Sequence, residues 1–463
     1  MLAAVAVFAA IAWLCNDVRR TSRTLGIIMA CGLLLRVGLG LTLFWLVETD
    51  APFLRSLRTP DGIWRFALDS AGYLHDASLA AGSGHIAPSA GFSPDYAAWL
   101  SAWMRLLGTS PVTAPLLNLT LVAIVCWLVV RTAAPTGRDA DDVPQLVAVG
   151  SFAFSPALLL HGSQALKDDL CAALIAIACV GALRLFAPEP EAGGRLRRRA
   201  TGLLTMLAAC YLLFGLRNYA VGLIGGATAV GATLPWACRR SSWRATARAG
   251  AAVLACAVLA VALWLGAAGS TMAARAESGR LLAVKAGSKA LGAPDALRHG
   301  FHKTGGNTNL VPGPVPAWRT PVPSLTVTQR ARALLTGLAA IFVPITLLQA
   351  TGAVELGIGR GLRLATDIDT IFLDASIAAA LLLLGRRQAA ARCHLRYVRF
   401  ALALGIATTI LMAYIVTNFG TLFRLRVMLA VPIWMLGVAV ACEPLPSVQR
   451  VQDAEFTPNV EGT

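Results

Sequence analysis

The chain has 463 residues, of which 57% are hydrophobic and only 14% are charged, and its mean hydropathy is +0.66. Soluble domains contain about 25% charged residues, so this composition excludes an ordinary soluble protein and predicts an all-α, polytopic membrane protein. The net charge of +16 does not indicate nucleic-acid binding, because the arginines stand in short loops between apolar runs, where the positive-inside rule expects them.

Apolar runs long enough to cross a hydrocarbon core of about 30 Å recur along the chain. Five basic loops, 16–23, 131–138, 193–199, 239–248 and 385–396, can all be placed in the cytoplasm. This orientation predicts a helical bundle of about eleven transmembrane helices, at 2–15, 25–47, 112–131, 144–160, 170–187, 202–216, 219–237, 249–269, 368–385, 398–417 and 425–442. Residues 1–442 then form one transmembrane domain, and the polar tail 443–463 is expected to be disordered in the cytoplasm.

Two long loops, 48–111 and 270–367, fall on the extracytoplasmic side in this arrangement. One apolar run, 331–352, does not fit the alternation of sides. We interpret it as a re-entrant or interfacial helix interrupted at Pro344, since broken helices are tolerated at membrane depth where protein buries them. The alternative is a full span, which would invert the topology of every later segment.

The first outer loop contains the stretch "WRFALDSAGYLHDASLA" (64–80), which can form a helix. Asp69, Tyr73 and Asp76 are four and three residues apart and would share one face of it. A carboxylate at the mouth of a membrane cavity could accept a proton from a hydroxyl group. The alternative interpretation is a solvated loop in which the aspartates only cap helices.

A short turn, "HGSQALKDDL" (161–170), separates two apolar runs on the same outer side. Lys167 could bind a phosphate oxygen, while Asp168 or Asp169 could cap the helix that begins there. The alternative is a local ion pair with a capping aspartate, which contributes little where it is exposed.

Three further segments place arginines where the positive-inside rule expects none. Arg217 interrupts "LLFGLRNYAVGL" (212–223), and Arg424 and Arg426 follow the outer end of a span in "NFGTLFRLR" (418–426). Two residues apart on a helix differ in direction by about 200°, so both arginines can reach one ligand only if the segment starts extended, as Gly420 would permit. Arg36, near the centre of its span, needs a partner, for which we consider Asp374 or water.

Several chemistries lack their motifs. The chain has no Walker lysine motif, no GxGxxG that opens a helix, no HExxH and no GxSxG. All ten cysteines lie in or beside apolar runs, so neither disulfides nor a zinc site are indicated.

Four short motifs together resemble the GT-C class of integral-membrane glycosyltransferases: "LDSAGY" in the first outer loop, "SQALKDD", "LRNY" and the late "NFGTLFRLR". Those enzymes take a sugar from a polyprenyl-phosphate or polyprenyl-diphosphate carrier on the outer face of the membrane. The resemblance implies a lipid-carrier-dependent hexosyl- or pentosyltransferase of the cytoplasmic membrane, with an extracytoplasmic active site and a role in cell-envelope polysaccharide synthesis. Its partners would be the polyprenyl-phosphate-sugar donor, a glycan or lipid acceptor and membrane lipids.

The resemblance also implies roles for individual residues. Asp69 becomes the candidate catalytic base, with Asp61 as a candidate second carboxylate and Asp50 as a further rival. No metal ligand is assigned, no cofactor is firmly implied, and a divalent cation is left open. The candidate substrate-binding residues are Tyr73, His161, Lys167, Asp168, Arg217, Asn218, Arg424 and Arg426.

Two other functions fit the same residues. A polysaccharide polymerase or ligase that moves lipid-diphosphate-linked glycans would use the same arginines and differ in the size of its outer cavity. A transporter or flippase for a lipid-linked sugar would need charged groups spread through the membrane depth, with Arg36 and Asp374 lining a path between the two faces.

Overall fold

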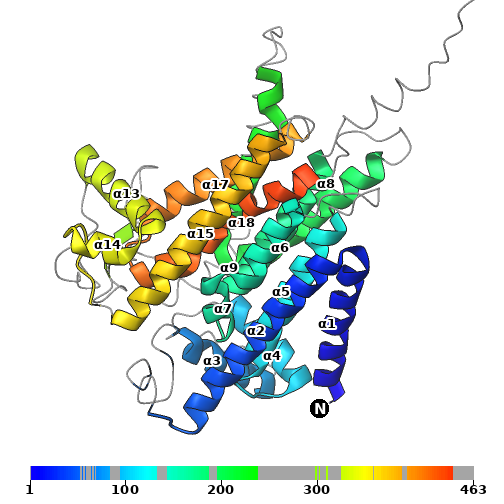
Figure 1. Ribbon diagram of the computed structural model, residues 1–463, viewed down its shortest axis with the longest axis vertical. Coiled ribbons are helices and arrows are strands. Elements are labelled where there is room, and N and C mark those ends of the chain that lie inside the picture. The colour runs from blue at the N-terminus through cyan, green and yellow to red at the C-terminus, as the bar shows by residue number, and fades with distance from the viewer. Residues whose placement is uncertain are drawn as a thin grey trace, which may run out of the picture.

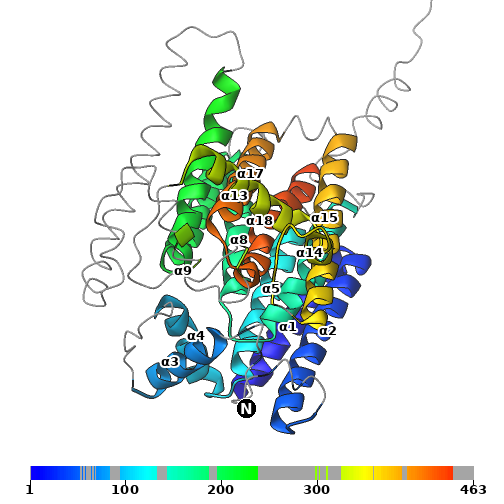
Figure 2. The same cartoon turned by 90° about the vertical axis from the view of Figure 1, so that its left-hand side faces the viewer.

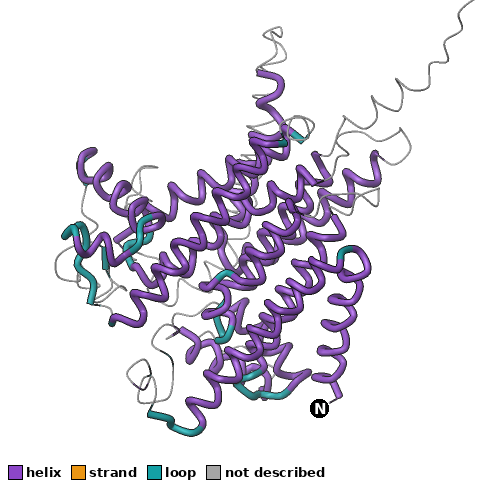
Figure 3. Tube along the Cα trace, in the orientation of Figure 1, coloured by secondary structure: helices purple, strands orange, loops and turns teal. Residues whose placement is uncertain are grey.

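The computed structural model describes residues 2–52, 55, 58, 64, 67, 69–83, 94–132, 143–186, 195–237, 298–299, 302, 309–310, 325–357, 359–387 and 394–441. Within these residues every regular element is a helix (Figure 3), which confirms the all-α class. Nine of the described helical segments are long and apolar enough to cross a membrane. The predicted span 249–269, the tail 443–463 and Asp61 lie outside the described residues.

The first four helices build one end of the bundle. Helices α1 (Leu2–Thr21) and α2 (Arg23–Glu48) form an antiparallel pair, and the predicted outer loop 48–111 contains two more helices, α3 (Asp69–Ser83) and α4 (Pro94–Leu107). Figures 1 and 2 place α3 and α4 together near the end of α2 and the start of α1. We call this the α3–α4 end of the bundle.

Helix α5 (Thr113–Thr132) returns from the α3–α4 end, and the predicted span 144–160 divides into α6 (Val143–Phe154) and α7 (Pro156–Gly162). The division is local in origin: Ser155 caps α7 by accepting a hydrogen bond from the Leu158 backbone N–H at 3.4 Å, and Pro156 follows it. After a turn, α8 (Asp168–Phe186) runs back through the core.

Helix α9 (Arg195–Ala237) has 43 residues, but it is not straight. The backbone of Arg217 is extended, with φ −153° and ψ 80°, and the Thr228 hydroxyl donates to the Met206 sulfur at 3.6 Å. In a continuous helix these two residues would lie about 33 Å apart. Helix α9 is therefore folded back on itself at Arg217, so the two spans predicted at 202–216 and 219–237 are its two halves.

The remaining described helices surround α18 (Phe419–Ala441), whose side chains are almost all buried. Helices α15 (Arg360–Arg386) and α17 (Leu395–Ile415) run beside it in Figure 1. The segment 331–352 is divided at Val343 and Pro344 into α13 (Val327–Phe342) and α14 (Ile345–Ala350). Neither piece is among the membrane-spanning candidates.

The described parts of four basic loops meet at the end of the bundle opposite α3 and α4. Asp17 forms an ion pair with Arg131. The hollow that Arg131 lines is also lined by Arg184 and Arg197. The Arg396 carbonyl lies against Gly231 beside Phe186. We call this the arginine-rich end. Helix α8 joins the two ends, because Asp168 is its first residue and Arg184 stands in its last turn.

Candidate functional site

Asp168 lies at the centre of a group of charged side chains at the start of α8. Its Oδ1 accepts a hydrogen bond from Arg217 Nη2 at 2.8 Å, and its Oδ2 lies 3.9 Å from Arg424 Nε. The Asp168 side chain is only 5% exposed and that of Arg217 only 11%. The break in α9 is what presents the guanidinium here, because an extended residue at 217 turns its side chain toward α8.

Asp69, the first residue of α3, is the fourth member of this group. Its Oδ2 accepts from Arg424 Nη2 at 2.8 Å, and its side chain is 44% exposed. The four side chains form an alternating series, Asp69–Arg424–Asp168–Arg217, which we call the charged series. It joins helices α3, α18, α8 and α9, so three of the predicted substrate-binding residues and the predicted base do converge.

Lys167 adds a third cation beside the charged series. Its Nζ donates to the Leu216 carbonyl at 3.4 Å, in the turn of α9 that carries Arg217. Burial, with a smaller contribution from the positive charge of Arg217, lowers the pKa of Lys167 to about 8. With Lys167 protonated, three cations face two carboxylates, so the site carries one surplus positive charge.

Aromatic side chains line the same region. Tyr73 of α3 is buried and packs edge to face on Tyr96 of α4, with ring centroids 4.9 Å apart. Burial raises the pKa of both phenols, so both stay protonated at neutral pH. The Tyr96 hydroxyl is buried without a hydrogen-bond partner among the described residues, and the Tyr219 hydroxyl accepts from Arg217 Nη1 at 3.2 Å.

Two predicted lining residues stand at the edge of the site. His161 of α7 is buried and packs against the Phe423 ring at 5.3 Å, next to Arg424. Asn218 follows Arg217 in the turn of α9 and is exposed.

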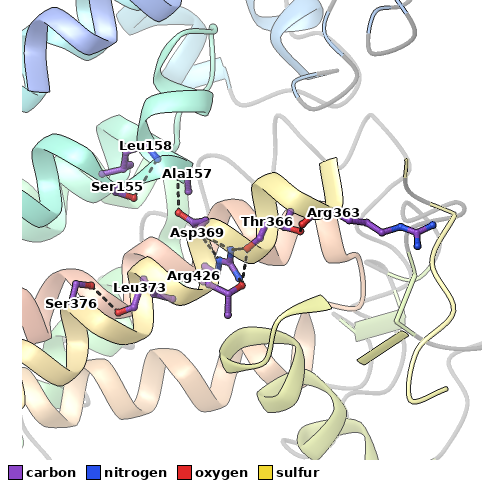
Figure 4. Close-up of polar contacts among 10 residues, drawn as sticks. Ser155, Ala157, Leu158, Arg363, Thr366, Asp369, Leu373, Ser376 and Arg426 are labelled. Atoms are coloured by element: carbon purple, nitrogen blue, oxygen red, sulfur yellow. Dashed lines mark hydrogen bonds and ion pairs between the residues drawn. The ribbon is translucent and has the colours of Figure 1, made fainter. Parts of the chain in front are cut away.

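Arg426, a predicted substrate-binding residue, does not join the charged series. Helix α18 starts at Phe419, where Asn418 Oδ1 accepts from the Thr421 N–H at 3.2 Å, so Arg426 points away from Arg424. It is 1% exposed, and its Nη2 lies 2.6 Å from Asp369 Oδ2 on α15. Figure 4 shows this pair, in which Asp369 also accepts from the Ala157 N–H at the start of α7.

Asp374 or water was considered from the sequence as the partner of Arg36, and the structure shows a different carboxylate. Arg36 pairs with Asp169 rather than with Asp374: its Nη1 lies 3.2 Å from Asp169 Oδ2 and donates to the Leu158 carbonyl, and its Nη2 donates to the Phe152 carbonyl. The adjacent aspartates therefore have different arginine partners: Asp168 contacts Arg217 and Arg424, and Asp169 contacts Arg36. Through Arg36, Asp169 links α8 to α2, α6 and α7.

A groove of about 480 Å³ lies beside the site, between α1, α2, α3 and α5. No member of the charged series lines it, but Ser70 and residues 162–165 do, and these are neighbours in the chain of Asp69 and Lys167. Its wall is mostly apolar, and part of it comes from the half of α2 that approaches the α3–α4 end. It is lined there by Val37, Gly40, Leu41, Leu43, Phe44 and Val47.

The other described carboxylates are weaker candidates than Asp69 for the catalytic base. Asp50, a rival base, is an exposed residue bound to Arg55 at 2.8 Å. Among the described residues no group of three or more His, Cys, Asp or Glu side chains is arranged to hold a metal ion.

Sequence reasoning missed Tyr96, Tyr219 and the roles of Asp169 and Asp369. Tyr219 stands inside the "LRNY" motif, so the motif itself was a usable signal. No sequence signal pointed to Tyr96 or Asp369, because their partners are distant in the chain.

Comparison of the chain with protein-family models, curated proteins and solved structures finds no significant match.

Proposed function

We propose that this protein is a membrane glycosyltransferase that moves a sugar from a polyprenyl-phosphate carrier to a glycan or lipid acceptor. The observation that carries the proposal is the charged series with Lys167 beside it. Three cations and two carboxylates gathered in a mostly buried place are costly to keep inside a membrane protein, and such groups usually serve function.

The proposed orientation follows from the distribution of arginines. The arginine-rich end faces the cytoplasm, as the positive-inside rule requires, so the α3–α4 end and the charged series face the extracytoplasmic side of the cytoplasmic membrane. Cell-envelope polysaccharides are assembled on that side, which makes their synthesis the proposed role.

A lipid-linked substrate suits the groove beside the site. Its hydrocarbon wall along α2 lies within the membrane-spanning part of the chain, where an isoprenoid or acyl chain is the natural occupant. A headgroup in the part of the groove lined by Ser70 and residues 162–165 would lie beside the chain neighbours of Asp69 and Lys167. A water-soluble sugar donor would have no use for this wall.

The charged series suggests that Asp69 is paired with Arg424 until the carrier phosphate binds. In the absence of substrate, Arg424 neutralises Asp69. A carrier phosphate that binds Lys167, Arg217 and Arg424 competes with Asp69 for the Arg424 guanidinium. Asp69 is then released from the ion pair, and its carboxylate is accessible to the acceptor hydroxyl.

The proposed reaction is a displacement at the anomeric carbon. The acceptor hydroxyl attacks that carbon while Asp69 takes its proton, and the bond from the carbon to the phosphate oxygen breaks. The polyprenyl phosphate leaves with the electron pair and gains one negative charge, which the fixed cations stabilise without rearranging.

The test uses the full-length protein in proteoliposomes with a panel of radiolabelled polyprenyl-phosphate hexoses and pentoses and isolated envelope membranes as acceptor. Wild-type protein should release polyprenyl phosphate from one of these donors. Asp69→Asn should reduce turnover about 10²-fold or more, the usual contribution of a general base, while Asp76→Asn on the same helix should not. Equal turnover by Asp69→Asn and wild type would remove Asp69 from the reaction.

A transporter would be favoured by a path between the two faces lined by Arg36 and Asp374. Arg36 is instead hydrogen-bonded to Asp169 and to two backbone carbonyls, so the transferase is the function we propose.

A further inference from the structure

The arginine-rich end contains a hollow of about 330 Å³ that the proposed transfer reaction does not use. It is lined by Arg131, Thr132, Arg184, Arg197, Arg198 and Thr201, which come from the ends of α5, α8 and α9. Asp168 and Arg184 are sixteen residues apart on α8, so the hollow is about 24 Å from the charged series.

Close helix crossing brings these arginines together. A Cβ atom at Gly181 would lie 2.7 Å from the Gly202 carbonyl oxygen, and one at Gly202 would lie 3.0 Å from Arg184 Cβ. The two glycines therefore let α8 and α9 approach until Arg184 stands beside the first turns of α9. The positive-inside rule accounts for arginines at this end, but not for their arrangement around one hollow.

Among the residues that the structure describes, three of the four guanidinium groups are available to a ligand. Asp17 holds Arg131 through two hydrogen bonds of 2.8 and 2.6 Å, which fixes one wall. Arg184, Arg197 and Arg198 have no carboxylate partner among the described residues. Within the part of the chain that the structure describes, the hollow therefore carries about three positive charges with no carboxylate beside them.

An exposed apolar strip continues from the hollow toward the membrane interior. Arg197, Thr201 and Leu204 are spaced four and three residues apart on α9 and share one face. Leu204 is 65% exposed, Leu207 is 49% exposed, and Tyr211, one heptad after Leu204, is 80% exposed. Cationic groups above an exposed hydrocarbon surface are complementary to an anionic lipid.

We infer that this hollow binds a phosphate group, and that its source is the headgroup of an anionic lipid in the cytoplasmic leaflet. Guanidinium groups bind phosphate oxygens in pairs, and basic pockets between transmembrane helices on this side are suited to such headgroups. The apolar strip holds the acyl chain, which free phosphate lacks. This inference does not depend on the proposed transferase activity.

The test counts lipids bound to the purified full-length protein by native mass spectrometry, with phosphatidylglycerol, phosphatidylcholine and inorganic phosphate as probes. Wild-type protein should prefer phosphatidylglycerol to phosphatidylcholine. The double variant Arg197→Gln/Arg198→Gln should bind phosphatidylglycerol roughly tenfold more weakly, because each basic residue contributes to the attraction of an anionic headgroup. The control Arg19→Gln/Arg20→Gln removes the same charge from the same end, outside the hollow, and should leave the affinity unchanged.

Two results would overturn the inference. Equal loss in both double variants would mean that the attraction is diffuse and that the hollow has no role. Inorganic phosphate that binds as tightly as the lipid, with Leu204→Gln having no effect on phosphatidylglycerol, would exclude a lipid as the occupant.

Discussion

Arg424 and Asp69 are 355 positions apart in the chain, yet their side chains are joined by a hydrogen bond of 2.8 Å. The same guanidinium lies 3.9 Å from Asp168, so one arginine of the central helix connects the start of α3 with the start of α8. An arrangement that ties a half-exposed carboxylate to a buried one through a single cation can be opened by a competing anion.

Replacing Arg217 by glutamine should weaken both the fold and the site. Asp168 is buried and would lose its nearest cation, and removal of one partner from a buried pair costs about 3–5 kcal/mol. We expect a clearly lower Tm in detergent and weaker binding of polyprenyl phosphate. Arg217→Lys should restore much of the affinity because it keeps the charge, whereas the exposed neighbour Asn218→Ala should resemble wild type in both assays. Unchanged stability in Arg217→Gln would argue against the pair.

Lys167 should give the site a characteristic pH dependence. Its pKa is lowered to about 8, so binding of polyprenyl phosphate should weaken as the pH rises through about 8, while the phosphate itself is already ionised above pH 7. Lys167→Arg should bind with no such change, since arginine stays protonated. If the affinity of wild-type protein for polyprenyl phosphate did not change between pH 7 and pH 9, Lys167 would not have this role.

The lowered pKa of Lys167 should make the fold more stable as the pH rises, although it makes phosphate binding weaker. Between pH 8 and the ordinary lysine value of 10.5, the unfolded chain binds more protons at Lys167 than the folded chain. The free energy of unfolding should therefore rise with pH across that window. Lys167→Met should remove this contribution, which chemical denaturation at several pH values would detect.

The pair of Arg426 and Asp369 should be structural. Asp369→Asn leaves the buried Arg426 charge uncompensated and should lower the free energy of unfolding by about 3–5 kcal/mol. Joint replacement, Arg426→Met with Asp369→Leu, should recover part of that loss and should bind polyprenyl phosphate like wild type. A double variant that is stable but does not bind would return Arg426 to the site.

Cysteine labelling should reveal the orientation. Thr109 lies in the exposed turn between α4 and α5, and Arg20 is exposed at the arginine-rich end. In intact cells a membrane-impermeant maleimide should label Thr109→Cys above the wild-type background, and Arg20→Cys only after the cells are permeabilised. The reverse pattern would place the charged series on the cytoplasmic side.

The sequence was sufficient for the features that depend on composition and local rules. Apolar runs and basic loops predicted the helices and the arginine-rich end, and Arg217 was recognised as a break because a charge there is out of place. The break between α6 and α7 was missed, although Ser155 and Pro156 form a recognisable helix start. A long apolar run concealed that short interruption.

Pairing between distant residues could not be predicted in the same way. Nothing in the spacing tells which of the two adjacent aspartates at the start of α8 meets Arg36 and which meets Arg217, because that choice depends on how α2 and α9 pack. For Arg426 the periodicity did contain the answer. Residues 424 and 426 point to different faces of a regular helix, and the assumption of an extended start, permitted by Gly420, was wrong.

The most direct test of the central claim is the affinity of the purified protein for polyprenyl phosphate, measured for wild type and Arg424→Gln. Loss of Arg424 removes the surplus positive charge and leaves Asp69 beside Asp168 without the cation between them. Arg424→Gln should bind roughly tenfold or more weakly, whereas Arg105→Gln, a variant of α4 outside the charged series, should bind like wild type. Equal affinity in Arg424→Gln and wild type would contradict the claim that these cations hold the carrier phosphate.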